Sequence, residues 1–369
     1  MSGLTMLTPY NLPGYLAGRG LLGRGSWTRH SCRVTEVRSR NRSWIVEFED
    51  GRGFFCKQAA TAREVDTLAT EACVYQILTA SLPSAAPDFL DFDPVDGILT
   101  VTAVGNARSL AVHFSRVTCL SLRLTRSIRA SLAKLHSVLP ADYPSAAHDL
   151  SSEPPWVLGV HRISAVDYPN YSAGSLQILA MIQQQGQACE ALDKMRAGWH
   201  ASELIHGDLK WENLIFVPRG RAGQSKVFIV DWEFACFGLR QWDLGCLIAE
   251  YFMWWAGSLH RIQKNQGDYT DVPASFAIES MTTSARELLD LDSHGAVTFE
   301  DLELLFSLAG ARLIQRIVEQ SQHQARITKH MLAALQLACN LLTHPSGAAD
   351  LLLSTSHEIA RRAANPGQS

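Results

Sequence analysis

The sequence predicts an α+β protein with two lobes, a small antiparallel β-sheet lobe carrying one helix and a large lobe that is mainly α-helical. Of three strand-like runs between residues 31 and 57, two alternate polar and apolar side chains, which is typical of half-buried strands, and the third is short and aromatic. After Gly245 the pattern is helical almost throughout. A chain of 369 residues is long enough for two such lobes and a large buried core.

The expected elements follow one another in a simple order. The strands are Ser31–Arg38, Trp44–Glu49, Gly53–Lys57 and Ile98–Val104. A helix is expected at residues 62–79, and Pro83–Pro94 is expected to be a connector. The first helices of the large lobe are expected at Leu110–Val117, Leu122–Leu139 and Ser175–Gly198. The Asp50-Gly51 pair in the sequence EDGRG is a strong hairpin signal.

Composition narrows the class of protein. A hydrophobic content of 47% with 19% charged residues is ordinary for a globular chain. The net charge of −3 argues against a nucleic-acid-binding surface built on bulk positive charge. The eight cysteines are scattered and contain no C-x-x-C pair, so neither a zinc cluster nor a disulfide framework is predicted.

The sequence also carries no membrane signal. The N-terminus lacks a basic region followed by a long apolar core, so no signal peptide is predicted. The most apolar run, Cys246–Gly257, is too short to span a bilayer and contains Glu250. We therefore expect a cytoplasmic protein with free thiols and no membrane partner.

The strongest functional signal lies in three segments between residues 204 and 245: LIHGDLKWENLIF, IVDWEFACFG and QWDLG. They predict a tight polar loop at Gly207 and Asp208, then a β-hairpin whose second strand ends at Asp231. Two aspartates and Asn213 converging at strand ends suit a magnesium site built from oxygen ligands. A loop of the form H-x-D-x-x-x-x-N followed by a strand-terminal Asp is the phosphoryl-transfer arrangement of kinases.

These motifs identify a family resemblance. HGD, DWE and QWDLG resemble the corresponding motifs of the aminoglycoside phosphotransferase and choline kinase-like family, which has a protein-kinase-like fold. The resemblance implies that Asp208 orients the acceptor hydroxyl and that Asn213 and Asp231 hold Mg²⁺. It further implies that Asp243 braces the catalytic loop, and that ATP is the phosphoryl donor.

The resemblance also divides the chain. It implies an N-terminal arm at residues 1–30, a small lobe at 31–103, a hinge at 104–106 and a large lobe at 107–369. The backbone from Ala103 to Gly105 is expected to hydrogen-bond adenine. The GRGLLGRG stretch of the arm lacks the G-x-x-x-x-G-K-[ST] spacing, so we expect the arm to pack on the small lobe rather than bind phosphate.

Lys57, near the end of the third strand, is the expected lysine for the nucleotide phosphates. Alternation places Phe55 on the same face. The helix that follows offers two acidic partners, Glu64 and Glu71. Glu71 better resembles the family pattern E-x-x-x-Y/F-x-x-L, whereas the position of Glu64 in the first helical turn explains an acid there without any function.

The turn SRNRS at residues 39–43 occupies the position of the kinase glycine-rich loop but contains no glycine. Asn41 is expected to serve the turn by adopting a positive φ. Arg40 and Arg42 have two interpretations that the sequence leaves open. Either they face the phosphates, or they are solvated turn residues.

The acceptor is predicted from weaker signals. Lys210, catalytic in this interpretation, resembles the lysine of Ser/Thr protein kinases that faces the γ-phosphate. The ordering RNRSW…FFCKQ, with Gln58 after the lysine, resembles phosphotransferase-like proteins of thioamitide and class V lanthipeptide clusters. That resemblance implies phosphorylation of Ser or Thr in a precursor peptide, with a partner lyase eliminating phosphate. Basic C-terminal residues such as Arg312 and Arg316 disfavour a polycationic acceptor. The aromatic stretch 140–170 has two interpretations: it lines the acceptor cleft, or it simply covers it.

Two other functions stay open. A small-molecule kinase acting on an aminoglycoside, amino alcohol or sugar hydroxyl would use the same catalytic residues. A pseudokinase acting as a binding module is the third possibility. The presence of Lys57, Asp208, Asn213 and Asp231 argues against it, and the glycine-free turn leaves room for it.

Overall fold

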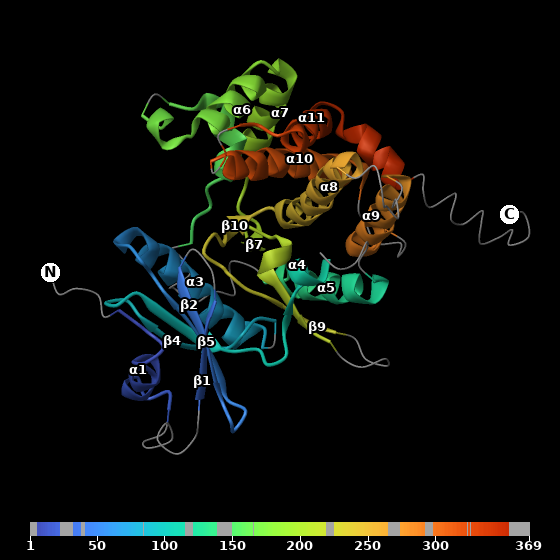
Figure 1. The fold of residues 1–369 in the computed structure, drawn as a ribbon. Helices are drawn as coiled ribbons and strands as arrows, with labels where there is room; N and C mark the ends of the chain where they lie inside the picture. Colours follow the sequence, from blue (N-terminus) through green and yellow to red (C-terminus); the bar gives the residue numbers. More distant parts are fainter. Residues whose placement is uncertain are drawn as a thin grey trace, which may run out of the picture.

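The computed structural model describes residues 6–22, 32–37, 41–83, 85–114, 121–138, 150–164, 166–218, 225–264, 274–291, 298–322, 324 and 326–353. It consists of a small sheet lobe and a larger helical lobe, and the catalytic-loop segment lies where the two meet (Figure 1). The predicted α+β, two-lobe fold class is confirmed.

The small lobe is built on a five-stranded antiparallel sheet with strand order β1-β2-β3-β5-β4. The strands are β1 (Cys32–Val37), β2 (Arg42–Phe48), β3 (Gly53–Gln58), β4 (Phe89–Asp93) and β5 (Ile98–Thr102). The predicted β2–β3 hairpin turns at Gly51, whose φ of +86° favours glycine. Phe48 N–H closes this turn by donating to Arg52 O at 2.9 Å.

Two helices cover the two faces of this sheet (Figure 1). Helix α1 (Leu12–Gly18) buries Leu12 and Leu16 against one face, in a cluster with residues of β2 and β3. Helix α3 (Ala62–Ser81) packs on the other face, against β4 and β5. The described part of the arm therefore packs on the small lobe. A bidentate ion pair from Arg19 to Asp91, with N–O distances of 2.6 and 2.8 Å, fastens it to β4.

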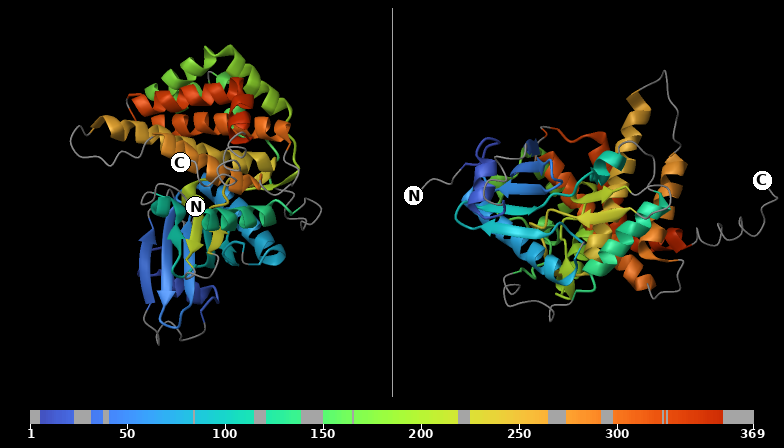
Figure 2. Two further views of the ribbon diagram at one scale, coloured as in Figure 1. Left: turned by 90° about the vertical axis from the view of Figure 1, so that its right-hand side faces the viewer. Right: turned by 90° about the horizontal axis from the view of Figure 1, so that it is seen from below.

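The green, orange and red helices of the large lobe are stacked on one another, opposite the blue sheet of the small lobe (Figure 2, left). Its helices are α4 (Leu110–Phe114), α5 (Leu122–Leu135), η3 (Trp156–Arg162), η4 (Tyr168–Asn170), α6 (Ala173–Gln183), α7 (Gly186–Ala197), η5 (Trp211–Asn213), α8 (Arg240–Lys264), α9 (Ala274–Leu289), α10 (Phe299–Ser321) and α11 (Lys329–Thr343). Two small sheets support the loop: β7 (Glu203–Ile205) with β10 (Cys236–Gly238), and β6 (Arg108–Ser109) with β8 (Leu214–Val217) and β9 (Lys226–Ile229).

The structure corrects two expectations. The connector Pro83–Pro94 contains strand β4, which pairs with β5 despite its acidic residues because Phe89 and Phe92 pack against the core. The single helix expected at Ser175–Gly198 is two helices, α6 and α7, interrupted at Gln184 and Gln185. A glycine at position 186 disfavours a continuous helix, and the break lets α6 pack on α10 while α7 packs on α11.

Helix α8 carries the most apolar run of the sequence into the centre of the large lobe. It packs against α9, α10 and α11, and its side chains from Cys246 to Ala249 are fully buried or nearly so. None of the helices within the described residues is long and apolar enough to cross a membrane. The run is therefore accounted for by core packing.

Close helix packing in this lobe depends on two glycines. A Cβ at Gly245 of α8 would lie 3.1 Å from Ala309 N of α10. A Cβ at Gly310 of α10 would lie 2.9 Å from Ala338 O of α11. The absence of a side chain at both positions lets the three helices approach closely, which sets the position of α10 beside the catalytic loop.

We predict that Gly310→Ala lowers the free energy of unfolding by about 1–3 kcal/mol, because the added methyl group meets the backbone of α11. Urea unfolding monitored by circular dichroism measures the change. Gly186→Ala is the matched control, since this exposed helical glycine has no atom within 4 Å of a built Cβ. Equal stability of the two variants would contradict the packing argument.

Candidate active site

The catalytic loop starts with a backbone turn that only glycine can make. Gly207 has a φ of +78°, and a Cβ at this position would lie 2.2 Å from Phe234 O. The contact arises because β7 pairs with β10, with Ile205 opposite Cys236, and this pairing brings the turn after Asp231 against the loop. Strand pairing and the close approach at Gly207 thus place the HGD and DWE segments side by side.

The buried carboxylate of Asp243 holds the loop from behind. Its Oδ2 accepts His206 N–H at 2.9 Å, and its Oδ1 accepts Gly207 N–H at 3.1 Å. His136 Nε2 lies 3.1 Å from Oδ2, and Trp242 Nε1 donates to Gly207 O at 2.8 Å. The side chain of Asp243 is 0% exposed, so its contacts with His206, Gly207 and His136 take the place of hydration.

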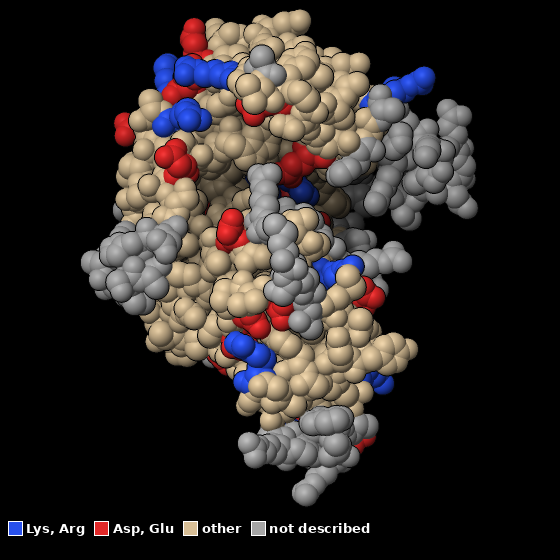
Figure 3. Space-filling model, turned by 90° about the vertical axis from the view of Figure 1, so that its left-hand side faces the viewer, with Lys and Arg blue, Asp and Glu red and all other residues tan. Residues whose placement is uncertain are grey.

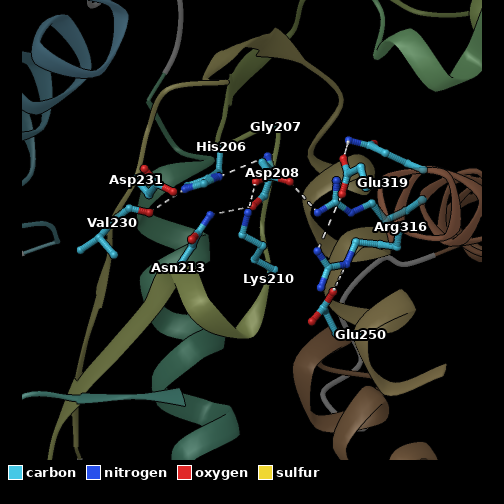
Figure 4. A network of polar contacts seen from close by, with 12 residues as sticks. His206, Gly207, Asp208, Lys210, Asn213, Val230, Asp231, Glu250, Arg316 and Glu319 are labelled. Carbon is cyan, nitrogen blue, oxygen red and sulfur yellow. Dashed lines mark hydrogen bonds and ion pairs between the residues drawn. The ribbon is translucent and has the colours of Figure 1, made fainter. Parts of the chain in front are cut away.

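The imidazole of His206 connects the loop to the end of β9 (Figure 4). Its Nδ1 accepts Asp208 N–H at 3.2 Å, which leaves Nε2 as the protonated nitrogen, 2.9 Å from Val230 O. His206 is fully buried. The ring therefore fixes the spacing between Asp208 and the segment after β9 that carries Asp231.

Asp208 has a cation on each carboxylate oxygen. Lys210 Nζ lies 2.5 Å from Oδ2, and Arg312 Nη2 lies 2.6 Å from Oδ1. Burial alone raises the pKa of Asp208, but the charges and hydrogen bonds of Arg312 and Lys210 outweigh it and lower the pKa to about 2. The carboxylate is therefore ionised throughout the physiological pH range.

Arg312 is the site residue that sequence reasoning missed. The sequence places it among the basic C-terminal residues that disfavour a polycationic acceptor, yet its side chain is 0% exposed and contacts Asp208. The two residues are 104 positions apart, so no local motif joins them. The available signal was its position in the apolar stripe of α10, where Leu305, Leu308 and Leu313 are also buried.

Asn213 and Asp231 offer oxygen ligands at neighbouring positions. Asn213 Nδ2 donates to Asp208 O at 3.0 Å, so its Oδ1 is the atom suited to a cation. Val230 N–H donates to Asn213 O at 3.0 Å, which places Asp231 beside it. Asp231 has a φ of +71°, a strained conformation that Asp and Asn tolerate better than other side chains.

These two ligands fit Mg²⁺, which usually binds one or two protein groups and completes its shell with phosphates and water. The Asp231 side chain is 33% exposed, enough to face a ligand in the cleft. Within the residues that the structure describes, no group of three or more His, Cys, Asp or Glu forms a protein-only metal site. A cation here would therefore depend on the nucleotide for further ligands.

Lys57 connects the small lobe to this site. Its Nζ lies 2.7 Å from Glu71 Oε2 and 2.5 Å from Asp231 Oδ1. Burial lowers the pKa of Lys57, but the charges of Glu71 and Asp231 outweigh it and hold the pKa above its usual value. Glu64 instead forms a capping box with Thr61 at the start of α3. The structure thus resolves the choice of partner in favour of Glu71.

Four other residues are expected from the sequence to contact the nucleotide: Ala103, Gly105, Asn41 and Arg40. Ala103 N–H donates to Gly53 O at 3.0 Å, so the sheet already uses this donor, and an adenine contact there would need the Ala103 carbonyl. Gly105 is exposed beyond the end of β5. Asn41 is 3% exposed and so packs inside the small lobe, and Arg40 lies outside the described residues. The phosphate role of this turn stays a prediction.

The face drawn in Figure 3 is hollowed between the two lobes, with charged side chains at the margin of the hollow. In the large lobe, a cavity of about 280 Å³ lies between the segment at residues 156–171 and the C-terminal half of α10. Its walls include Trp156, Asp167, Tyr171 and Glu319. Glu319 lies seven positions beyond Arg312 on α10, roughly 10 Å along the helix. The described part of the stretch 140–170 therefore lines a cavity along the helix that contacts Asp208.

Comparison with known proteins agrees with this geometry. Residues 33–276 match the family model described as the phosphotransferase enzyme family. A variant of aminoglycoside 2′-phosphotransferase-IIIa bound to GDP superposes with a TM-score of 0.56 at 13% identity, covering 93% of this chain and 100% of that one. An ethanolamine kinase of Plasmodium vivax gives a TM-score of 0.53 at 14% identity, with coverages of 96% and 92%.

A choline/ethanolamine kinase family protein from Mesorhizobium loti gives a TM-score of 0.50 at 13% identity, covering 92% of this chain and 98% of that one. No curated protein matches the chain. At these identities the solved structures show the fold alone, whereas the family model covers well over half of the sequence. The chain belongs to the phosphotransferase enzyme family and is a phosphotransferase with a kinase-like fold.

Proposed function

We propose that the protein uses ATP and Mg²⁺ to phosphorylate a hydroxyl group. The observation that carries the proposal is the arrangement of Asp208, held by two cations, beside the Lys57–Asp231 pair that joins the lobes. Family members similar in fold are kinases of ethanolamine and phosphotransferases of aminoglycosides, which supports a hydroxyl acceptor. The intact ion pairs favour catalysis over a role as a binding module.

Phosphoryl transfer passes through a loose transition state, so the protein mainly positions groups and neutralises charge. Asp208, with a pKa of about 2, would orient the acceptor hydroxyl and receive its proton late, as the new P–O bond forms and the bond to the leaving diphosphate breaks. Lys210 would neutralise charge on the transferred group, and Lys57 would bind the remaining phosphates. Mg²⁺, held by Asn213 and Asp231, would supply further charge neutralisation.

The first candidate acceptor is a Ser or Thr hydroxyl of a precursor peptide, with a partner lyase that eliminates the phosphate. Contact between Lys210 and Asp208 supports a peptide acceptor. The exposed aromatic rings of Trp156 and Tyr168, in the segment at residues 156–171, also support it. Arg312 is buried against Asp208, so it offers no positive charge to an acceptor surface. Gln58 is buried and accepts Leu7 N–H, which gives this residue a role in anchoring the arm.

The second candidate is a small molecule with a cationic group, such as an amino alcohol or aminoglycoside. The cavity beside α10 favours it, because Trp156 and Tyr171 offer aromatic faces while Asp167 and Glu319 offer negative charge. The Glu319 side chain is 41% exposed. Aromatic and acidic groups together suit an ammonium ion.

We predict that Asp231→Asn abolishes Mg²⁺-dependent ATP binding. Asn tolerates the left-handed backbone at this position, so the change removes charge with little added strain. Isothermal titration calorimetry with ATP, in the presence and absence of Mg²⁺, measures the effect. Asp193→Asn, at a surface ion pair with Arg162, is the control. Unchanged Mg²⁺-ATP affinity in Asp231→Asn would exclude the assigned metal site.

We predict that Asp208→Asn lowers kcat by at least about 10²-fold while the protein stays folded. The amide cannot accept the acceptor proton and cannot balance the charge of Arg312. Steady-state kinetics on the best acceptor give kcat, and circular dichroism checks the fold. A variant with near-native turnover would mean that the HGD loop is not the catalytic centre.

We predict that a Ser/Thr-containing precursor peptide gains one phosphate when incubated with the protein, ATP and Mg²⁺, and loses water overall once the lyase is added. Mass spectrometry distinguishes the two products. Choline, ethanolamine and an aminoglycoside are tested in parallel by ATP consumption. Turnover of one of these with no modified peptide would assign the protein to the second candidate function.

A further inference from the structure

Arg312 reaches the catalytic aspartate from a distant part of the chain. It lies in the middle of α10, its side chain is 0% exposed, and its Nη2 is 2.6 Å from Asp208 Oδ1. Placing a guanidinium in the protein interior costs several kcal/mol unless a close anion compensates it. Asp208 supplies that compensation, so α10 and the catalytic loop are coupled electrostatically.

The contact is dedicated to Asp208 rather than part of a general ion-pair scaffold. Within the described residues, Arg312 Nε and Nη1 have no hydrogen-bond partner. Arg316, one turn further along α10, instead approaches two acids, Glu250 at 3.1 Å and Glu319 at 3.8 Å (Figure 4). An arginine kept only for packing would be expected to satisfy most of its donors, because unpaired buried donors are unfavourable.

The other polar atoms of Asp208 have partners on the catalytic loop, and only Oδ1 depends on Arg312. Its N–H is held by His206, its carbonyl by Asn213, and its Oδ2 by Lys210. The backbone is therefore fixed by the loop itself, but of the two cations on the carboxylate, Lys210 is 23% exposed. Arg312 is the fully buried partner, and its contact with Oδ1 limits how the carboxylate can turn.

We propose that Arg312 is a positioning residue that orients the Asp208 carboxylate toward the acceptor hydroxyl. The proposal rests on the proposed function, because it assigns the same role to Asp208. Arg312 acts through Asp208 and needs no contact with the nucleotide or the acceptor. Its removal therefore lowers turnover more than it weakens substrate binding, since small misplacements of a reacting group reduce rate by up to about 10²-fold.

The test compares Arg312→Met, Arg312→Lys and Arg286→Met. Arg286, on α9, is also a buried arginine and is hydrogen-bonded to Leu352 O, so it controls for the loss of a buried guanidinium. We expect Arg312→Met to lower kcat about 10- to 100-fold with KM for ATP nearly unchanged, and Arg312→Lys to recover part of the loss. Arg286→Met is expected to lose stability and keep kcat.

A double-mutant cycle separates positioning from general damage. Because Arg312 acts through Asp208, adding Arg312→Met to Asp208→Asn is expected to cause no further loss of kcat. Additive losses, or an equal loss of kcat in Arg286→Met, would overturn the proposal. Hydrogen exchange at the amides of residues 206–213 gives a readout without an acceptor, and faster exchange is expected in Arg312→Met but not in Arg286→Met.

The two proposals fail in different ways. If the wild-type protein neither binds Mg²⁺-ATP nor consumes ATP with any acceptor, the proposed function is refuted, and so is the catalytic role of Asp208. A protein that turns over ATP normally in Arg312→Met, or whose loop amides exchange at the native rate in that variant, refutes the positioning role alone.

Discussion

The carboxylate of Asp243 is the constraint on which the catalytic site depends. By accepting the backbone N–H groups of His206 and Gly207, it fixes a turn that no side chain at position 207 would allow. Because Asp243 belongs to the first turn of α8, and α8 packs in the core of the large lobe, this core sets the position of the loop. Packing of α8 on α10 through Gly245 then brings Arg312 to Asp208.

Opposite charges alternate through the site, from Glu71 to Lys57, Asp231, Lys210, Asp208 and Arg312. Each buried charge has a partner of opposite sign, which limits the desolvation cost of an interior ionic site. Lys57 spans the two lobes, so the distance between the lobes at this point is set by its contacts with Glu71 and Asp231. A bound nucleotide would replace one of these two contacts of Lys57 with a contact to phosphate. Nucleotide binding would therefore change the distance between the lobes.

The sequence predicted the parts of the fold and site that are local in the chain. The HGD and DWE segments carry their own strand and turn signals, whereas Glu71 was favoured over Glu64 as the partner of Lys57 only by its resemblance to the family pattern. Strand β4 was missed because its acidic residues masked an edge strand with two packed phenylalanines. Arg312 was misassigned because only tertiary packing distinguishes a buried arginine in an apolar stripe from a solvated one.

In the proposed function, helix α10 would contribute to both phosphoryl transfer and acceptor binding. Its middle turn holds Asp208 through Arg312, while its C-terminal turns, with Glu319, line the cavity opposite Trp156. The catalytic half would serve any hydroxyl, because it acts on the reacting oxygen alone. Under the second candidate function, acceptor choice would depend on the aromatic and acidic side chains of the segment at residues 156–171, which line the cavity together with α10. A substitution in that segment should therefore alter KM for the acceptor while leaving the geometry of Asp208 intact.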